Sequence, residues 1–289
     1  MPALQLPANG AVRLGSVQLP QGYRTHARGP RDGSTQSVAW VTVTPVPDPG
    51  AVWAELSEMS AETGLVPFIA RTHFSDPHRP WDDGRSRPPS DLGDPADLAV
   101  ASQIDVASAL RASWDRLAEF PPEDEEEDPE ESEWWQREHA RAIAPFFDGF
   151  PGLAPACTQP LDHRQVRDAI SGLPPARIGL AVADRPADAL AAMGWLPGNW
   201  FEGIGELTAV LRSWEDRFGA RLLAVGFDEF KLLAERPPRG RSAGQHLAAE
   251  VFALSPNEFF CAWDEEALTD LNDIADSLIR SPIWGFWWD

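Results

Sequence analysis

The sequence predicts an α+β fold in which a mixed β-sheet packs against amphipathic helices, in two lobes. Within residues 38–70 a strand, a helix and a second strand follow one another, a pattern typical of parallel strands. Residues 222–234 contain two strands around a short turn, which indicates an antiparallel hairpin. Four large aromatic side chains occupy the last six positions, so the end of the chain must be packed. A chain of 289 residues, 43% hydrophobic, can bury such a core.

The first third of the chain contains the strand–helix–strand unit. Residues 1–37 are rich in glycine, proline and arginine, and their short apolar pieces are consistent with edge strands and turns. Val38–Thr44 predicts a strand that ends at Pro45, because proline cannot donate a hydrogen bond to a ladder. Apolar residues at positions 52, 56 and 59 predict a helix, for which Gly64 suits a left-handed cap. Leu65–Ala70 then predicts the second strand.

The middle of the chain alternates loops and helices. Residues 71–94 are polar and proline-rich, which predicts a long loop. Asp94 and Pro95 suit the N-cap and first position of a helix that continues to Leu117. Glu123–Glu133 has nine carboxylates in eleven residues and no basic residue, so it predicts a solvated loop. Residues 134–147 predict another helix, and residues 151–175 predict a proline-rich connection.

The last part of the chain has the strongest periodicity. Arg177–Ala183 predicts a strand, and Asp184 with Pro186 predicts the start of a short helix that ends at Met193. Ile204–Phe218 is the clearest amphipathic helix in the chain and ends at Gly219. The remaining predicted elements are the hairpin Leu222–Val225 with Phe230–Ala234, helices Ala243–Leu254 and Glu265–Arg280, and a terminal strand within Ser281–Asp289.

These elements divide the sequence into three predicted regions. Residues 1–120 form an N-terminal α/β region with the strand–helix–strand unit. Residues 121–176 form an acidic and proline-rich connecting region, and residues 177–289 form a C-terminal α+β domain.

Three segments of the C-terminal region together resemble a bacterial family known only as domain of unknown function 4253: Leu211–Ala220, Arg236–Pro238 and Trp284–Asp289. The resemblance covers roughly residues 177–289 and implies a fold but no activity. Trp53, residues 63–65 and Pro67 are similar to the region that such proteins carry upstream. Where the family pattern has Cys-Pro-Asp after the penultimate helix, this chain has Ser255–Asn257, so any chemistry of that cysteine or aspartate is missing here.

Composition excludes several classes of function. A net charge of −21 and a pI near 4.6 argue against nucleic-acid binding, which needs a basic face, and against an anionic membrane. Cys157 and Cys261 are far apart in sequence and form no metal or disulfide motif. The sequence shows neither an export signal nor a membrane-spanning run. We therefore expect a cytoplasmic protein that binds no nucleic acid or membrane.

Residues 73–83 contain the candidate metal ligands. His73, Asp76 and His78 offer nitrogen and oxygen donors that could hold zinc or a harder divalent ion. Their spacing matches no metal-binding motif, and a proline-rich loop orients ligands only if it packs down. The solvated-loop interpretation is therefore preferred, and neither a metal nor a cofactor is predicted.

Other candidate residues have both a functional and a structural interpretation. Asp184 follows a strand, where α/β sheets place ligand-binding groups, but an N-cap belongs at the same position. Asp228 and Glu229 could act as an acid–base pair, although a hairpin turn also favours aspartate. Tryptophans could present a surface to a ligand or partner, or could pack in the core; the candidates are Trp195, Trp200 and Trp263.

Two hypotheses of function follow. The first is a non-enzymatic binding or adaptor protein of the immunity type, whose acidic surface meets a basic protein partner. The second is an enzyme of unknown class that uses carboxylates at strand ends or in residues 73–83. The catalytic residues of such an enzyme are unknown. The excess of acid and the lack of a recognisable catalytic motif favour the first hypothesis.

Overall fold

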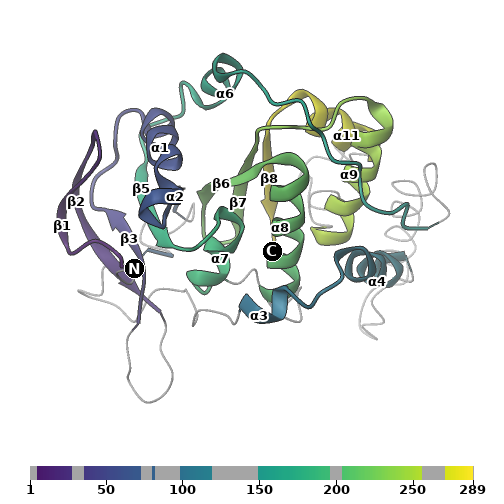
Figure 1. The fold of residues 1–289 in the computed structure, drawn as a ribbon, viewed down its shortest axis with the longest axis horizontal. Helices are drawn as coiled ribbons and strands as arrows, with labels where there is room; N and C mark the ends of the chain where they lie inside the picture. The colour runs from purple at the N-terminus through teal and green to yellow at the C-terminus, as the bar shows by residue number, and fades with distance from the viewer. Residues whose placement is uncertain are drawn as a thin grey trace, which may run out of the picture.

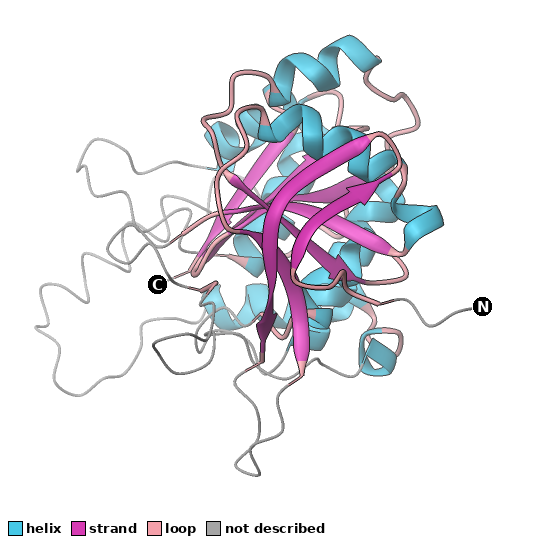
Figure 2. Cartoon of the chain, turned by 90° about the vertical axis from the view of Figure 1, so that its left-hand side faces the viewer, coloured by secondary structure: helices cyan, strands magenta, loops and turns pink. Residues whose placement is uncertain are grey.

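A computed structural model describes residues 5–27, 36–72, 80–81, 98–118, 149–195, 204–255 and 271–288. In this part of the chain the strands form one mixed sheet of eight strands, in the order β1-β2-β3-β5-β4-β6-β7-β8 (Figure 1). The sheet is strongly twisted, as Figure 2 shows. Its strands are β1 (Gly10–Leu14), β2 (Val17–His26), β3 (Ser37–Thr42), β4 (Leu65–Ala70), β5 (Arg177–Val182), β6 (Ala220–Val225), β7 (Glu229–Ala234) and β8 (Ile283–Trp287).

Strand β5 joins the two halves of the sequence. It lies between β3 and β4 and is antiparallel to both, so β3 and β4 run in the same direction without being neighbours. The neighbouring strands β4 and β6 are parallel, whereas β6 and β7 form an antiparallel hairpin. The α+β class with a mixed sheet is thereby confirmed, and strands from residues 1–120 and 177–289 share one sheet.

Helices cover both faces of the sheet. One core cluster lies between the sheet and helices that include α4, α7, α8, α9 and α11, and a second cluster packs against α1 and α6. The described helices are α1 (Pro49–Glu58), α2 (Ser60–Thr63), α3 (Leu98–Ala101), α4 (Val106–Ala118), α6 (His163–Ile170), α7 (Ala189–Ala192), α8 (Ile204–Phe218), α9 (Arg241–Leu254), α11 (Leu271–Arg280) and the 3-10 helix η1 (Pro186–Asp188). No helix of these residues is long and apolar enough to cross a membrane.

The ends of α1, α2 and α8 follow from local chemistry. Asp48 accepts a hydrogen bond of 3.0 Å from the backbone nitrogen of Ala51, and proline occupies the start of α1. Gly64 ends α2 with φ +63°, as the sequence predicted. Helix α8 has the predicted bounds, and Gly219 follows it with φ +60°.

The end of the chain is the predicted strand. Strand β8 is antiparallel to β7 and lies at an edge of the sheet. The exposed fraction is 2% for each of Trp284, Phe286 and Trp288, while Gly285 between the first two is exposed. This alternation places three of the aromatic rings in the core next to α8.

Two helix predictions were wrong. The helix expected to run from Pro95 to Leu117 is interrupted after α3, because Asp105 begins a new helix by accepting a 2.8 Å hydrogen bond from the backbone nitrogen of Ser108. Helix α6 lies in the passage expected to be a proline-rich connection. It begins with a capping box, in which Asp162 and Gln165 each accept a hydrogen bond from the other's backbone nitrogen.

Some predictions fall outside the described residues. They concern the acidic run Glu123–Glu133, the helix in residues 134–147, most of the loop in residues 71–94 and the start of the helix predicted from Glu265.

Candidate functional site

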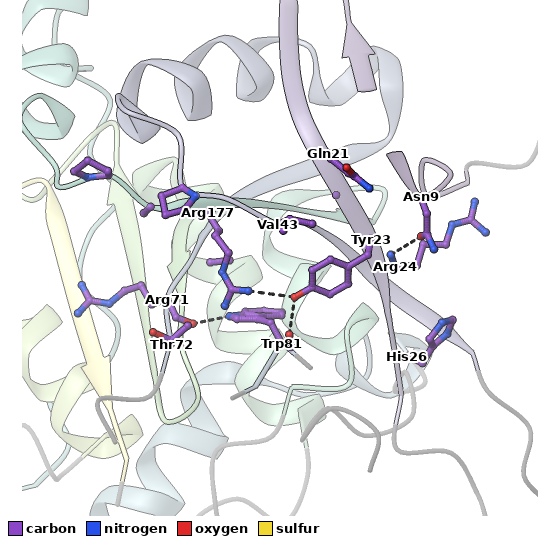
Figure 3. Close-up of a pocket in the computed structure, with 15 residues that line it drawn as sticks. Asn9, Gln21, Tyr23, Arg24, His26, Val43, Arg71, Thr72, Trp81 and Arg177 are labelled. Carbon is purple, nitrogen blue, oxygen red and sulfur yellow. Dashed lines mark hydrogen bonds between the residues drawn. The ribbon is translucent and has the colours of Figure 1, made fainter. Parts of the chain in front are cut away.

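A pocket of about 870 Å³ opens where β4 ends, β5 begins and β2 passes beside them (Figure 3). The carboxyl end of β4, which pairs in parallel with β6, is where ligands commonly bind in sheets with parallel strands. The pocket is lined by Asn9, Gln21, Gly22, Tyr23, Arg24, His26, Val43, Pro45, Ala70, Arg71, Thr72, Trp81, Pro175, Ala176 and Arg177. We call it the arginine pocket.

A chain of hydrogen bonds fixes the floor of the arginine pocket. Arg177, the first residue of β5, donates from Nη1 to the hydroxyl oxygen of Tyr23 at 3.1 Å. The Tyr23 hydroxyl donates to the carbonyl oxygen of Trp81 at 2.6 Å, and Trp81 Nε1 donates to the carbonyl oxygen of Arg71 at 2.5 Å. Figure 3 shows the four residues joined in this order. The tyrosine therefore holds the arginine in one orientation.

The other terminal nitrogen of Arg177 lacks a partner. Nη2 is buried and makes no hydrogen bond, and no described carboxylate forms an ion pair with this guanidinium. An unsatisfied buried donor costs about 1–3 kcal/mol, and more when the group is charged. Most buried polar atoms in folded proteins are satisfied, so this nitrogen is an exception that needs an explanation.

The guanidinium groups of the other two arginines in the described lining have partners. Arg71 places Nε 2.5 Å from a carboxylate oxygen of Glu229, and its side chain is 47% exposed. Arg24 turns its guanidinium to the carbonyl oxygens of Leu6 and Pro7, at 2.6 and 2.7 Å, and so anchors the preceding segment. Arg177 differs from both, because its Nη2 has neither a carbonyl nor a carboxylate partner.

The described lining of the pocket is basic, although the chain has a net charge of −21. Among the described residues that line it there are three arginines and no aspartate or glutamate. Across the described residues, arginine and lysine are almost as numerous as aspartate and glutamate, so most of the net negative charge belongs to the rest of the sequence. The arrangement can donate hydrogen bonds to an anionic group and disfavours a cation.

Of the four residues predicted as a ligand or partner surface, the structure describes Trp195 and Asp184. Trp195 is 1% exposed, donates to the carbonyl oxygen of Gly226 at 2.9 Å and packs edge-on against Phe230, so it belongs to the core and presents no surface. Asp184 is exposed. Trp200 and Trp263 lie outside the described residues.

The predicted cap role of Asp184 was wrong. Arg185, not Asp184, precedes the short helix η1, and no side chain caps that helix. The Arg185 guanidinium instead donates from Nε to Glu215 at 2.9 Å and from Nη2 to Asp216 at 2.7 Å, both on α8. The pKa of Arg185 is raised: burial opposes the charged form, but hydrogen bonds and attraction from the two carboxylates outweigh it.

The predicted metal ligands stay untested. His73, Asp76 and His78 lie outside the described residues. Within the part of the chain that the structure describes, no three His, Cys, Asp or Glu side chains gather in a way that could hold a metal ion.

The predicted turn at Asp228 and Glu229 is present. The backbone nitrogen of Gly226 donates to the carbonyl oxygen of Glu229 at 2.7 Å, which closes the connection between β6 and β7. The Glu229 side chain reaches Arg71 at the rim of the arginine pocket. This glutamate therefore connects the hairpin to the end of β4.

Sequence reasoning missed the arginine pocket. Its central pair, Tyr23 and Arg177, is separated by more than half of the chain, and no motif links the two residues. The signal that could have drawn attention to it is that Tyr23 is the single tyrosine of the chain. A tyrosine hydroxyl that is partly buried usually has a specific partner.

The segments that carry the family resemblance have structural roles. In Leu211–Ala220, Arg212 binds the buried Asp188 through two hydrogen bonds of 2.6 and 3.1 Å. Arg217 binds the fully buried Glu250 through 2.5 and 2.8 Å hydrogen bonds, and Trp214 Nε1 donates to the same carboxylate at 2.8 Å. These contacts connect α8 to η1 and α9.

Two further family positions hold elements together. Arg236, in Arg236–Pro238, donates to the carbonyl oxygen of Asp216 at 3.0 Å at the end of α8. Ser255, where the family pattern has cysteine, is fully buried and donates to the carbonyl oxygen of Trp287 at 3.0 Å. The serine thus connects the end of α9 to β8.

Comparison with known proteins gives one family. Residues 177–289 match the family described as Domain of unknown function (DUF4253), so the resemblance inferred from the three segments is confirmed over this part of the chain. No curated protein and no solved structure matches the chain. The matched region begins at Arg177 and so includes the central arginine of the pocket.

Proposed function

We propose that this chain, whose residues 177–289 match a domain family of unknown function, is a non-enzymatic binding or adaptor protein that receives a basic protein partner. The observation that carries the proposal is the uneven distribution of charge. The described residues are almost balanced in charge, whereas the net charge of the whole chain is −21. The run Glu123–Glu133 alone contributes nine carboxylates without a basic residue.

Such a concentration of negative charge favours an encounter with a basic surface. A block of like charges projects a field beyond its own contacts, and fields of this kind raise association rates. The effect depends on salt, because the screening length falls from about 10 Å at 0.1 M to about 3 Å at 1 M salt. The acidic run is therefore proposed to speed capture of the partner, which other residues then hold.

The contacts of two described carboxylates, Glu229 and Glu250, support binding over catalysis. Glu229, beside the arginine pocket, is occupied by an ion pair with Arg71. Glu250, the fully buried glutamate, is occupied by Arg217 and Trp214. Both carboxylates have structural partners that account for their positions.

An enzyme of unknown class is the alternative. The observation in its favour is a contact at the edge of the arginine pocket, where Nδ1 of His26 lies 3.2 Å from the hydroxyl oxygen of Ser37. A histidine next to a serine is one part of a nucleophilic site. An enzymatic activity of the full chain that is lost in a Ser37→Ala variant, while the variant still folds normally, would favour this alternative.

The test of the proposed function uses two replacements of residues 123–133. One is a Gly/Ser linker of equal length, and its matched control replaces each glutamate by glutamine and each aspartate by asparagine. The partner is captured from native lysate on the immobilised chain and identified by mass spectrometry. Association rates are then measured against salt concentration. Both variants should associate more slowly than the unaltered chain at low salt and at nearly the same rate at 1 M salt.

Two outcomes would contradict the proposal. An unchanged association rate at low salt would remove the steering role of the acidic run. A captured partner that is itself acidic would exclude a basic partner altogether.

A further inference from the structure

We propose that the arginine pocket binds a small organic anion, whose carboxylate or phosphoryl group is held by the guanidinium of Arg177. The inference depends neither on the acidic run nor on the basic protein partner. It rests on the orientation of Arg177, the charge of the lining and the size of the pocket.

Arg177 is oriented but not saturated. Tyr23 accepts from Nη1 at 3.1 Å and is itself fixed by its 2.6 Å hydrogen bond to Trp81. Nη2 remains buried without a partner. A guanidinium is a planar fork that binds carboxylate and phosphate oxygens well, and an arginine held in place loses less entropy on binding. Nη2 is closed to solvent in this structure, and an anionic oxygen that reaches it when a neighbouring side chain moves would give it a partner.

The lining selects for negative charge. Arg71 directly follows β4 and Arg177 begins the adjacent strand β5, and Ala70 is paired with Arg177 in the register of the sheet. Among the described residues that line the pocket there is no aspartate or glutamate, although Glu229 beside it pairs with Arg71. Thr72 and Gln21 add polar groups around the arginines. Figure 3 shows Arg177 beside Tyr23 and Trp81, whereas the Arg71 side chain extends away from these three residues.

The size and the apolar part of the lining indicate an organic body. A volume of about 870 Å³ lies in the range of sites for small organic ligands and exceeds what one inorganic anion fills. Val43 is 51% exposed although it is a large apolar residue, and it lines the pocket. The prolines Pro45 and Pro175 also line it. A ligand with an anionic group and an apolar portion would use both kinds of surface.

The experiment measures anion binding to the full chain by thermal unfolding and calorimetry. The probes are inorganic phosphate and citrate, each against sodium chloride at equal ionic strength, with glycerol as the uncharged probe. Phosphate or citrate should raise the unfolding temperature in a saturable way, and glycerol should show no saturation. The anion that binds with the higher affinity shows whether the site prefers a phosphoryl or a carboxylate group.

The first variant pair tests the arginine. Arg177→Gln should weaken binding of the preferred anion roughly tenfold to hundredfold, because a hydrogen bond to a charged group is lost. The matched control is Arg164→Gln on α6, where the side chain is 86% exposed and lies outside the pocket lining. This control should bind the anion with unchanged affinity.

The second variant pair tests the site without removing a buried group. Val43→Glu places a carboxylate at an exposed lining position and should abolish anion binding by repulsion, whereas the neutral Val43→Gln should retain it. Equal anion effects in the unaltered chain, Arg177→Gln and Val43→Glu would overturn the proposal. Such a result would show general stabilisation by salt instead of a site. Absence of saturable binding by both anions would overturn it as well.

Discussion

The rings of Trp214 and Phe286 are stacked, with centroids 5.2 Å apart and planes inclined by 25°. The ring of Trp284 packs edge-on against the ring of Phe218, with centroids 5.6 Å apart. Two of the segments that resemble the family, Leu211–Ala220 and Trp284–Asp289, are therefore packed directly on one another. The aromatic side chains of both segments therefore have a packing role in one core.

Deletion of residues 284–289 should destroy the fold. The deletion removes three aromatic side chains that are each 2% exposed, and a single large-to-small change at such a position costs about 3–5 kcal/mol. The whole stability of a domain is only about 5–15 kcal/mol. Thermal unfolding followed by circular dichroism measures the effect.

A single substitution tests the packing of the aromatic end without shortening the chain. Phe286→Ala should destabilise the protein by about 3–5 kcal/mol. Gly285→Ala is the matched control, because a methyl group there meets no atom within 4 Å. For the deletion of residues 284–289, a shortened chain that stays soluble with an unaltered unfolding temperature would show that the aromatic end is not part of the core.

Glu250→Gln should destabilise the protein by about 3–5 kcal/mol, because it leaves the guanidinium of Arg217 buried without its carboxylate. The Arg217 side chain is only 14% exposed, so water replaces little of the lost contact. Combining Glu250→Gln with Arg217→Met should recover part of the loss, since no unpaired charge then remains. Denaturant unfolding of the single and double variants measures both effects.

The control for this pair is Asp276→Asn, which removes an exposed ion pair with Arg280 on α11. Exposed pairs contribute about 0–1 kcal/mol, so this change should be nearly silent. Similar losses of unfolding free energy for the buried and the exposed ion pair would contradict the prediction that the buried pair of Glu250 and Arg217 matters more for stability.

Asp105 should titrate below the ordinary range of an aspartate. Its pKa is lowered chiefly by a side-chain hydrogen bond with Ser108, and further by the backbone nitrogen of the same residue. A lowered folded-state pKa means that the associated stability is present above the unfolded-state pKa and is lost as pH falls through the folded-state pKa. Carbon-detected NMR titration of the Asp105 carboxyl measures the shift.

Ser108→Ala should raise the pKa of Asp105 toward its ordinary value, because the side-chain hydrogen bond is removed while the backbone one stays. Ser113→Ala, on the same helix, is the control and should leave the Asp105 titration unchanged. An Asp105 pKa that does not respond to Ser108→Ala would assign the shift to another cause.

The purified chain should contain no stoichiometric metal. The expectation comes from the sequence, where the spacing of His73, Asp76 and His78 matches no metal-binding motif. Elemental analysis of the protein prepared without chelator decides it. Stoichiometric zinc or manganese that disappears in the double variant His73→Ala, His78→Ala would revive the enzyme alternative.

Local elements were predictable because their signals are local. The buried stripe of Ile204–Phe218 and the glycine that follows it determined both ends of α8. The interruption before Asp105 and the capping box at Asp162 were also visible in the sequence, as polar residues suited to helix starts. A long apolar period across Asp105 and a high proline content around Asp162 obscure these two signals.

The arrangement of the sheet and the arginine pocket could not be predicted in the same way. Periodicity shows that residues 177–182 form a strand, but it does not show which strands lie beside it. Arg177 meets Tyr23 only because β5 takes a place among strands from the first third of the chain. A site built by such long-range pairing leaves no motif in the sequence.

The position of β5 also determines when the sheet can be completed during synthesis. A ribosome releases β3 and β4 long before residues 177–182, so the nascent chain holds two strands whose shared neighbour does not yet exist. Unpaired strand edges invite wrong pairing with other chains, and delayed long-range pairing slows folding. A fragment of residues 1–120 would lack β5 altogether, so the edges of β3 and β4 that β5 covers would stay unpaired. We therefore expect this fragment to aggregate.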